Sequence, residues 1–357
     1  MRVAIIGAGM TGASAASALA DAGAEVTVFD KGRGPGGRMS SKRLPPDDAS
    51  GGYLQLDMGA QYFTARHPWF LRQVRQWQQQ GVVQRWDFAP HIWQHALLLP
   101  SDDETTRYVG TPAMHQMLRA QLGTLVQHYS CQVTELSYSL SSFSSQQSGE
   151  WTVSTADGAS YAGFDALILT CPPEQCRKLL AVQPLAERIP ADLLQPCWAV
   201  ALALAEPVKH AAVGIFVKSG PLSWCARNNV KPGRLAMSEH WVLHLNAESS
   251  LQLLEATAEE VAAVAELAFS QIVGQNLQVT SALCHRWLYA SYHAELPPPG
   301  VLNDPVQRLV VAGDWSLGGR VENAWLAGVT AASRLLPELI KAPDLSAKAA
   351  DSMLAAQ

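Results

Sequence analysis

The sequence predicts an α/β fold in which a Rossmann-like, parallel dinucleotide-binding sheet is interrupted by a largely antiparallel α+β domain. Three observations predict it. A strand, a glycine-rich turn and a helix open the chain; a second strand ends in an acid; and short strand-like runs crowd the middle of the chain. At 357 residues the chain exceeds the length of about 250–300 at which one core stops growing, so two domains are expected.

The N-terminal unit is predicted to be strand–helix–strand. The run RVAII (2–6) is typical of a buried strand, residues 21–23 end the helix that follows, and EVTVFD (25–30) alternates as a second strand. This unit has about the length that two parallel strands and their crossover helix need, so it predicts the start of a parallel sheet.

The next segments predict helices separated by short strands. Residues 67–80 form a helical pattern, and a helix over 111–122 is expected because Thr111 suits the N-cap and Pro112 the first helical position. The Ser/Gln-rich stretch 139–150 is interpreted as a solvated hairpin loop. Strands are expected within 81–90, 91–100, 124–138 and 151–155.

The second half returns to alternating elements after a strand-rich middle. Helices are expected at 257–273 and from about 321 to 336, the first of them amphipathic. Strands are expected at 164–173, where a double proline ends the run, repeatedly between 196 and 245, and at 283–292 and 308–315.

The motif GAGMTG carries the strongest functional signal. Gly7 allows the tight turn, Gly9 lets a pyrophosphate approach the backbone, and Gly12 lets the helix pack on the strand. The helix that opens at Met10 and Thr11 offers free N–H groups and a positive dipole end to phosphates. These features predict dinucleotide binding.

The acid and the basic segment after it bear on which dinucleotide binds. Asp30 lies 18 residues after Gly12, where an acid binds ribose hydroxyls. It opens the stretch DKGRGPGGRMSSKR (30–43), which also holds Lys31 and, further on, Gly37, Arg38 and Met39. A plain NAD domain needs no second glycine–arginine segment after its acid, so this stretch favours FAD over NAD.

Residues 3–41 resemble the FAD fingerprint of the glutathione-reductase-like and amine-oxidase-like flavoproteins. Five further segments, LDMGAQYFTAR, RYVGTPAM, SWCARNNVKPGR, HRWLYA and AGDWSLGGRVENAWLAG, are similar to bacterial members of the renalase family. The resemblance covers roughly residues 3–336. It implies a p-hydroxybenzoate-hydroxylase/amine-oxidase-like architecture and oxidation of 1,2- and 1,6-dihydro-NAD(P) isomers by FAD, with O2 as final acceptor and H2O2 as product.

This architecture implies a discontinuous cofactor domain. We expect the FAD-binding domain at residues 1–62, 105–178 and 300–340, the substrate domain at 63–104 and 179–299, and a C-terminal tail at 341–357. Binding is predicted to be noncovalent, because Cys284 is the last cysteine and lies before the AGDW segment to which a cysteine would have to be close.

The resemblance also implies roles for single residues. Asp314, after Gly313, would bind the flavin ribityl chain, and the helix beginning near Arg320 and Val321 would point at the flavin ring. Arg38 would contact the pyrophosphate, and Gln61, beside Ala60, the isoalloxazine. Val133 would contact adenine, although core packing explains it almost equally well.

Tyr62, His244 and Trp287 are the candidate catalytic residues. They fall in matching segments and can stack on or hydrogen-bond a ligand ring. Oxidation of a dihydropyridine by hydride transfer needs no proton abstraction, so the expected role of the protein is to orient the ring. The competing hypothesis for all three side chains is a place in the core.

Composition restricts the partners. The net charge of −5 argues against nucleic acid, and the longest apolar runs are too short for a membrane span, so a cytoplasmic protein with a dinucleotide substrate is expected. No metal site is expected, since His91 and His95 have no partnering acid. A flavin amine oxidase, a noncatalytic flavin-binding module and a plain NAD dehydrogenase remain the alternatives. The sequence leaves the oligomeric state open.

Overall fold

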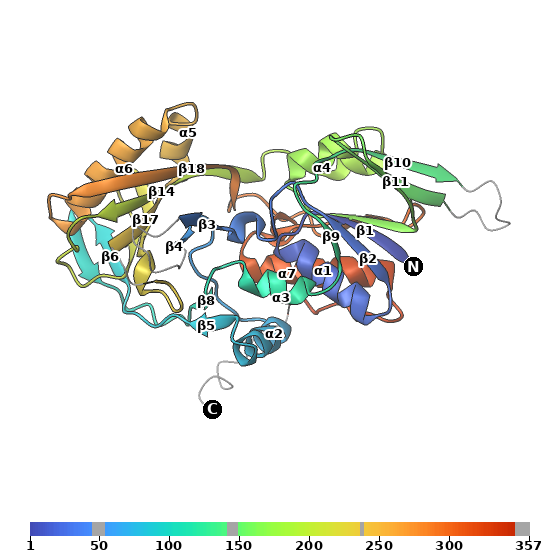
Figure 1. Ribbon diagram of the computed structural model, residues 1–357, viewed down its shortest axis with the longest axis horizontal. Coiled ribbons are helices and arrows are strands. Elements are labelled where there is room, and N and C mark those ends of the chain that lie inside the picture. The colour runs from blue at the N-terminus through green and yellow to red at the C-terminus, as the bar shows by residue number, and fades with distance from the viewer. Residues whose placement is uncertain (45–53, 141–148, 236–238, 347–357) are drawn as a thin grey trace.

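The computed structural model describes residues 1–44, 54–140, 149–235 and 239–346. Two large sheets lie side by side along the long axis of the molecule, with most helices packed against their faces (Figure 1). One sheet is mainly parallel and the other mainly antiparallel, so the predicted α/β fold with a Rossmann-like sheet is confirmed.

The first sheet has six strands, all parallel to their neighbours except for one antiparallel edge strand, β19. From edge to edge they are β19 (Leu302–Asp304), β20 (Leu309–Val311), β13 (Ala166–Leu169), β1 (Arg2–Ile6), β2 (Glu25–Phe29) and β9 (Val126–His128). The central strands β1 and β13 are nearly continuous apolar runs because both faces of the sheet are covered.

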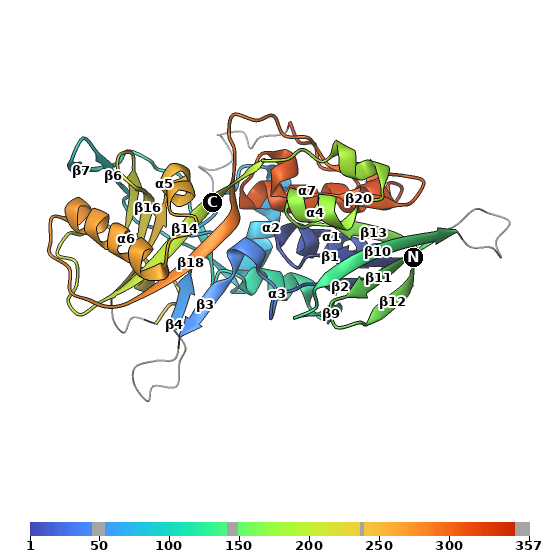
Figure 2. The ribbon, with the colours of Figure 1, turned by 90° about the horizontal axis from the view of Figure 1, so that it is seen from above.

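Different layers cover the two faces of this sheet. Helices α1 (Met10–Asp21), α3 (Gln116–Leu122) and α7 (Val321–Leu335) pack on the face formed by Val3 and Ile5. The opposite face meets helix α4 (Pro173–Leu179) and a three-stranded sheet. That sheet consists of β10 (Val133–Leu140), β11 (Gly149–Thr155) and β12 (Ser160–Phe164), and Figure 2 shows it beside the strands of the parallel sheet.

The second sheet has seven strands and is antiparallel except where β15 runs parallel to β6. Its order is β18 (Val279–Tyr292), β14 (Leu194–Leu204), β17 (Glu239–Leu245), β16 (Leu222–Arg227), β15 (Gly214–Val217), β6 (His91–Gln94) and β7 (Leu97–Pro100). Helix α6 (Ala258–Val273) covers one face, and the short helix α5 (Ala247–Gln252) follows β17. A capping box between Thr257 and Glu260 starts α6, and Gly274 in the left-handed conformation ends it.

The other face of the second sheet meets a two-stranded ribbon of β3 (Ser41–Leu44) and β4 (Leu54–Asp57). Leu54, Leu56 and Met58 pack there against Ala199 and Val242. The ribbon thereby holds the chain that follows the glycine–arginine segment against the antiparallel sheet.

Helix α2 (Pro68–Gln79) lies on the side of the parallel sheet, with the Phe70 and Trp325 rings 5.7 Å apart. A second ribbon, β5 (Val83–Arg85) with β8 (Tyr108–Gly110), follows it. Helix α2, predicted in the substrate domain, therefore packs on the parallel sheet. The β3–β4 ribbon, predicted in the FAD-binding domain, packs on the antiparallel sheet. Those boundaries stay a prediction.

One helix begins later than predicted. Helix α3 starts at Gln116 and not near Pro112, because Met114 N, the donor that a cap at Thr111 would bind, donates to Ser41 Oγ at 3.1 Å and residues 111–115 form turns and bends. Residues 141–148 of the Ser/Gln-rich stretch lie outside the described residues, as does the tail beyond 346. Over the described ranges, no helix has both the length and the hydrophobicity to cross a membrane.

Candidate functional site

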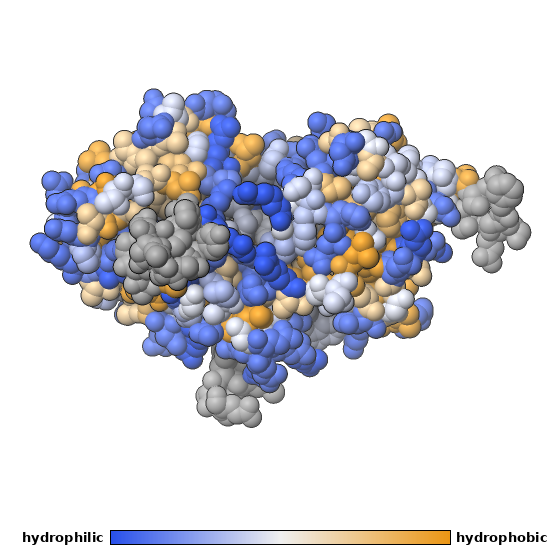
Figure 3. Space-filling model, in the orientation of Figure 1, coloured by the Kyte–Doolittle hydropathy of each residue, from blue (hydrophilic) through white to orange (hydrophobic). Residues whose placement is uncertain are grey.

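A cavity of about 1090 Å³ lies between the two sheets, at the carboxyl ends of β1 and β2. It extends from Val133 at the start of β10, past the GAGMTG turn, to His244 and Trp287 on the antiparallel sheet. Hydrophilic residues border a hollow between the two halves of the molecule in Figure 3. The crevice outside the carboxyl ends of parallel strands is where such sheets bind ligands.

The glycine turn at one end of the cavity leaves backbone N–H groups free. Gly7 has a φ of 113° and lies against Thr170, and Gly12 lies under it, where a Cβ would be 1.9 Å from Gly7 O. The N-cap of α1 is Gly9, whose missing side chain leaves the first N–H groups of the helix without a cap. The turn is therefore able to bind an anionic group such as a phosphate.

Asp30 organises this end. Its carboxylate accepts hydrogen bonds from Ala8 N at 2.7 Å and from Gly32 N at 2.6 Å. These bonds join the end of β2 to the glycine turn and place Asp30 in the cavity wall. A carboxylate has about four acceptor sites, so Asp30 can still accept from ligand hydroxyl groups.

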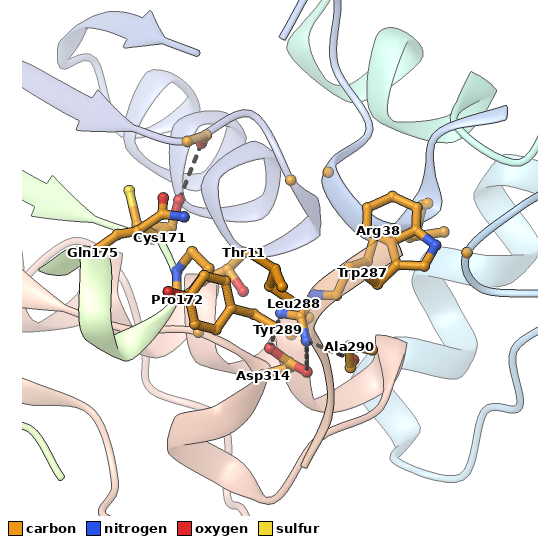
Figure 4. A pocket seen from close by; sticks show the side chains of 18 of the residues that line it. Thr11, Arg38, Cys171, Pro172, Gln175, Trp287, Leu288, Tyr289, Ala290 and Asp314 are labelled. Atoms are coloured by element: carbon orange, nitrogen blue, oxygen red, sulfur yellow. Dashed lines mark hydrogen bonds and ion pairs between the residues drawn. The ribbon is translucent and has the colours of Figure 1, made fainter. Parts of the chain in front are cut away.

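Arg38 and Asp314 face one another in the middle of the cavity wall. The guanidinium donates through both terminal nitrogens to the two carboxylate oxygens, one bond measuring 3.0 Å. It also donates to Ala290 O at 3.1 Å, and Figure 4 shows both interactions beside the Trp287 ring. This pairing places a fixed positive group and a fixed negative group next to each other along the path of a ligand.

At the far end, His244 and Trp287 share one acceptor. Met58 O accepts from Trp287 Nε1 at 2.9 Å and is 3.2 Å from His244 Nε2. Both side chains come from the antiparallel sheet, whereas Met58 follows the ribbon strand β4. Burial lowers the pKa of His244 to about 4, with the nearby Lys231 charge acting in the same direction. The ring is therefore neutral at physiological pH.

The loop that carries Met58 is held by a buried ionic cluster. Asp57 Oδ2 accepts from Arg234 Nη2 at 2.6 Å and from Lys231 Nζ at 3.2 Å, and all three side chains are inaccessible to solvent. Burial alone would raise the pKa of Asp57, but the charges of Lys231 and Arg234 and hydrogen bonds to the carboxylate lower it to about 2. Burial lowers the pKa of Lys231 to about 8, although Asp57 opposes the shift.

Tyr62 lies outside the cavity lining. Its ring packs 5.4 Å from the Trp224 ring, and the Arg107 guanidinium lies 5.2 Å from its centre. Burial raises the pKa of the Tyr62 phenol, although the Arg107 charge opposes the shift. Tyr62 thus belongs to an aromatic cluster behind the loop that carries Met58, and its catalytic role stays a prediction.

Most of the other predicted residues line the cavity together. His244 and Trp287 do so with Gly7, Gly9, Met10, Thr11, Asp30, Lys31, Gly37, Arg38, Met39, Ala60, Val133, Gly313, Asp314, Arg320 and Val321. Gly12 and Gln61 do not line it. Gly12 packs under the turn, as its predicted packing role requires, and Gln61 donates to Asp57 O and Gly59 O and accepts from Lys231 Nζ.

Sequence reasoning missed several of these groups. Lys231 and Arg234 lie in SWCARNNVKPGR, a segment that was named only for its similarity to the renalase family. Two basic residues next to apolar strands were the one sequence feature that could have indicated a buried ionic cluster. Asp57 lies in LDMGAQYFTAR in the same way. Met58 acts through its backbone carbonyl, so no side-chain signal could have pointed to it.

The lining fits an elongated dinucleotide. The turn at Gly7 and Gly9 suits a pyrophosphate, and Asp30 suits ribose hydroxyls. Arg38 supplies a cation between these groups and the end of the cavity at His244 and Trp287, which we call the ring end. The N-terminus of α7, whose N-cap Arg320 makes no side-chain cap, borders the cavity beside Asp314. A flavin ring in the region of Trp287 would therefore lie near the positive end of a helix dipole.

Comparisons with known proteins agree with this geometry. Residues 5–77 match the model of the NAD(P)-binding Rossmann-like domain, and residues 89–336 match that of the flavin containing amine oxidoreductases.

Two solved structures share the fold. One is a proposed protoporphyrinogen oxidase from Exiguobacterium sp. 255-15, with a TM-score of 0.70 at 12% identity over 94% of this chain and 99% of that chain. The other is an oxidoreductase from Methanosarcina mazei, with a TM-score of 0.66 at 14% identity over 92% of this chain and 99% of that chain. The amine oxidoreductase match spans well over half of the sequence, and the cavity suits the flavin that this family uses. The chain is a flavin-dependent oxidoreductase and belongs to the flavin containing amine oxidoreductase family.

Proposed function

We propose that the chain is a renalase-like oxidase that binds FAD noncovalently and converts 1,2- and/or 1,6-dihydro-NAD(P) to NAD(P)+. The bound FAD would accept a hydride from the dihydropyridine ring and pass the electrons to O2, giving H2O2. The substrate would be a soluble dinucleotide, and the cell compartment that we propose is the cytoplasm.

The charge of the ring end of the cavity carries this proposal. Among the described lining residues, the acids are Asp30, at the opposite end, and Asp314, paired with Arg38. Beyond Trp287 the wall presents neutral His244 and Arg286, whose guanidinium is paired with Glu255 at 3.3 Å. A protonated amine would find no free carboxylate there, whereas an anionic dinucleotide with a neutral dihydropyridine ring meets a compatible surface.

The nature of the cavity supports FAD. Its length, from Val133 to Trp287, suits a dinucleotide better than a mononucleotide. The stretch 312–328, which runs along the cavity into α7, contains neither cysteine nor histidine, the side chains best suited to a covalent flavin link. We therefore propose noncovalent FAD, with Arg38 at the pyrophosphate and Asp314 at the ribityl chain.

The residues at the ring end would act by positioning. Trp287 is fixed by its bond to Met58 O and presents an aromatic surface at the cavity. Holding a substrate ring against such a wall orients the carbon that donates hydride and excludes water from it. Because loss of a hydride from the dihydropyridine gives the aromatic pyridinium ring directly, no proton has to be removed by the protein.

Anaerobic titration of the yellow holoprotein tests the proposal. Each of the two isomers, added separately, should bleach the oxidised flavin absorbance rapidly, and ordinary 1,4-NADH should do so slowly. Readmitting O2 should restore the absorbance with one H2O2 per turnover. Equal bleaching by 1,4-NADH, or bleaching by neither isomer, would contradict the proposal.

An amine oxidase is the second candidate, because the matching family is that of flavin containing amine oxidoreductases. It predicts a different product. Turnover of a primary amine or polyamine with one aldehyde formed per H2O2, and no bleaching by the dihydro isomers, would favour it. A flavin that no metabolite reduces would instead favour a noncatalytic binding module.

A further inference from the structure

We infer that His244 is held as its Nε2–H tautomer and that Nδ1 serves as a hydrogen-bond acceptor that selects a primary carboxamide on the substrate ring. The inference rests on the proposed function, since it identifies which part of a nicotinamide the ring end of the cavity recognises.

The tautomer follows from the partner of the ring. His244 Nε2 is 3.2 Å from Met58 O, and a carbonyl oxygen can only accept. The hydrogen of the neutral ring must therefore reside on Nε2, which leaves the lone pair on Nδ1. Trp287 Nε1 supplies the second donor to the same oxygen at 2.9 Å, so both lone pairs of Met58 O are used.

The Met58 carbonyl is fixed in place from both sides. Ala60 N donates to Arg38 O at 2.9 Å, and a Cβ on Gly59 would lie 2.0 Å from that same oxygen, so the loop lies close against the glycine–arginine segment. Lys231 Nζ donates to Gln61 Oε1 at 2.9 Å, and the Gln61 amide donates back to Asp57 O. An acceptor braced in this way cannot follow the ring if His244 turns.

The second nitrogen is left for a ligand. Within the described part of the chain, His244 Nδ1 has no hydrogen-bond partner. The atom is not fully enclosed by protein, unlike the buried polar atoms without a partner elsewhere in the molecule. The His244 side chain lines the cavity beside Trp287. The open lone pair of Nδ1 therefore belongs to the cavity surface.

An open lone pair discriminates between ligands by the hydrogens they carry. A carboxamide N–H satisfies it, whereas an ester or a carboxylate presents another lone pair and leaves two acceptors facing one another. The low pKa of the ring supports this assignment, because a protonated imidazole would reverse the preference. The cavity thus distinguishes nicotinamide from its ester or acid at the side chain of the ring.

Two matched variants separate the anchor from the acceptor. In His244→Gln the amide nitrogen reaches the position of Nε2, which keeps the donor to Met58 O and removes the acceptor at Nδ1. In His244→Asn the amide oxygen takes the position of Nδ1, which keeps the acceptor and removes the anchor.

Binding of nicotinamide and of methyl nicotinate to the holoprotein, followed by the flavin absorbance, tests the inference. The wild type should bind nicotinamide at least about fivefold more tightly, the value of one neutral hydrogen bond. This preference should disappear in His244→Gln and persist in His244→Asn. Equal affinities in the wild type, a preference retained in His244→Gln, or a loss in both variants would overturn it.

A second readout needs no ligand. Nitrogen-15 NMR of histidine-labelled protein, with the His244 signals identified by their absence in either variant, should show a protonated Nε2 and an unprotonated Nδ1 at pH 7. A protonated Nδ1 would overturn the inference. Neither measurement requires turnover, so failure of the isomer titration would contradict the proposed function alone.

Discussion

Arg38 and Asp314 form a bidentate ion pair in the wall of the cavity, although they are 276 positions apart in the chain. Arg38 comes from the segment after β2 and Asp314 from the turn after β20, so the pair closes the cofactor cavity between two distant parts of the sequence. The side chain of Asp314 is 11% exposed and that of Arg38 is 30% exposed, which leaves the cation within reach of a ligand.

Replacing Arg38 should weaken flavin binding. In Arg38→Met the cavity loses its cation and keeps the Asp314 carboxylate, which then faces the anionic cofactor without a partner. Loss of charged hydrogen bonds predicts a dissociation constant for FAD about tenfold to a hundredfold higher. Fluorescence of released FAD measures it. Arg33→Met, an exposed site in the same segment, is the control and should bind FAD like the wild type.

Two of the three glycines of the GAGMTG turn, Gly9 and Gly12, should separate effects on cofactor binding from effects on folding. Among the described residues, no heavy atom beyond the neighbours of Gly9 in the chain lies within 4 Å of a Cβ built on it, so Gly9→Ala should leave the free energy of unfolding of the apoprotein unchanged. Its methyl group would project into the cavity and should weaken FAD binding. Gly12→Ala should instead lower the stability by about 1–3 kcal/mol, because its Cβ would lie 1.9 Å from Gly7 O. Urea unfolding and FAD titration of both apoproteins would reveal any reversal of this order.

Asp57 should matter far more to stability than a surface acid does. Asp57→Asn leaves Lys231 and Arg234 buried without their counter-charge, so the free energy of unfolding should fall by about 3 kcal/mol. Asp87→Asn is the matched control, since the Arg85–Asp87 pair is 58% and 70% exposed and should contribute below about 1 kcal/mol. Similar losses in the two variants would contradict the structural role of the cluster.

His244 should make the protein less stable in acid. Its pKa is about 4 when folded against 6.5 for a free ring, so between these values the unfolded chain binds more protons than the folded one. The free energy of unfolding should therefore be highest above pH 6.5 and should decrease as the pH falls through 4, by on the order of 2 kcal/mol. His115 shifts in the same direction, so the decrease should be smaller, not absent, in His244→Gln. Urea unfolding at pH 7, 5.5 and 4.5 provides the comparison, and parallel curves for the two proteins would exclude His244 as the source.

The sequence predicted the strand, turn and helix at the proposed phosphate site because their conformations depend on residues that are close together in the chain. Gly7, Gly9 and Gly12 stand between a strand and a helix, and both elements form where the sequence indicates. The predicted N-terminus of α3 was wrong because Met114 N, which a cap at Thr111 would bind, donates to Ser41 Oγ of β3, a strand distant in the sequence that no capping rule includes. The same reason explains why the sequence predicted His244 and Trp287 but not the backbone carbonyl of Met58 between them. The position of Met58 O between His244 and Trp287 depends on packing of β4 against the antiparallel sheet, which the sequence does not encode at any one position.

The close contact of α1 with α7 also has a consequence for biosynthesis. Gly328 in α7 lies so near Ser14 that a Cβ would be 1.9 Å from its Oγ, and the inner side of α1 is a run of small buried residues matched to this approach. The ribosome releases β1, α1 and β2 long before β20 and α7. Until α7 emerges, the nascent N-terminal unit has an uncovered face, and it has no Asp314 to oppose Arg38. We therefore expect the cofactor to bind late in synthesis, and a chain that stops before α7 to remain colourless and to require chaperones.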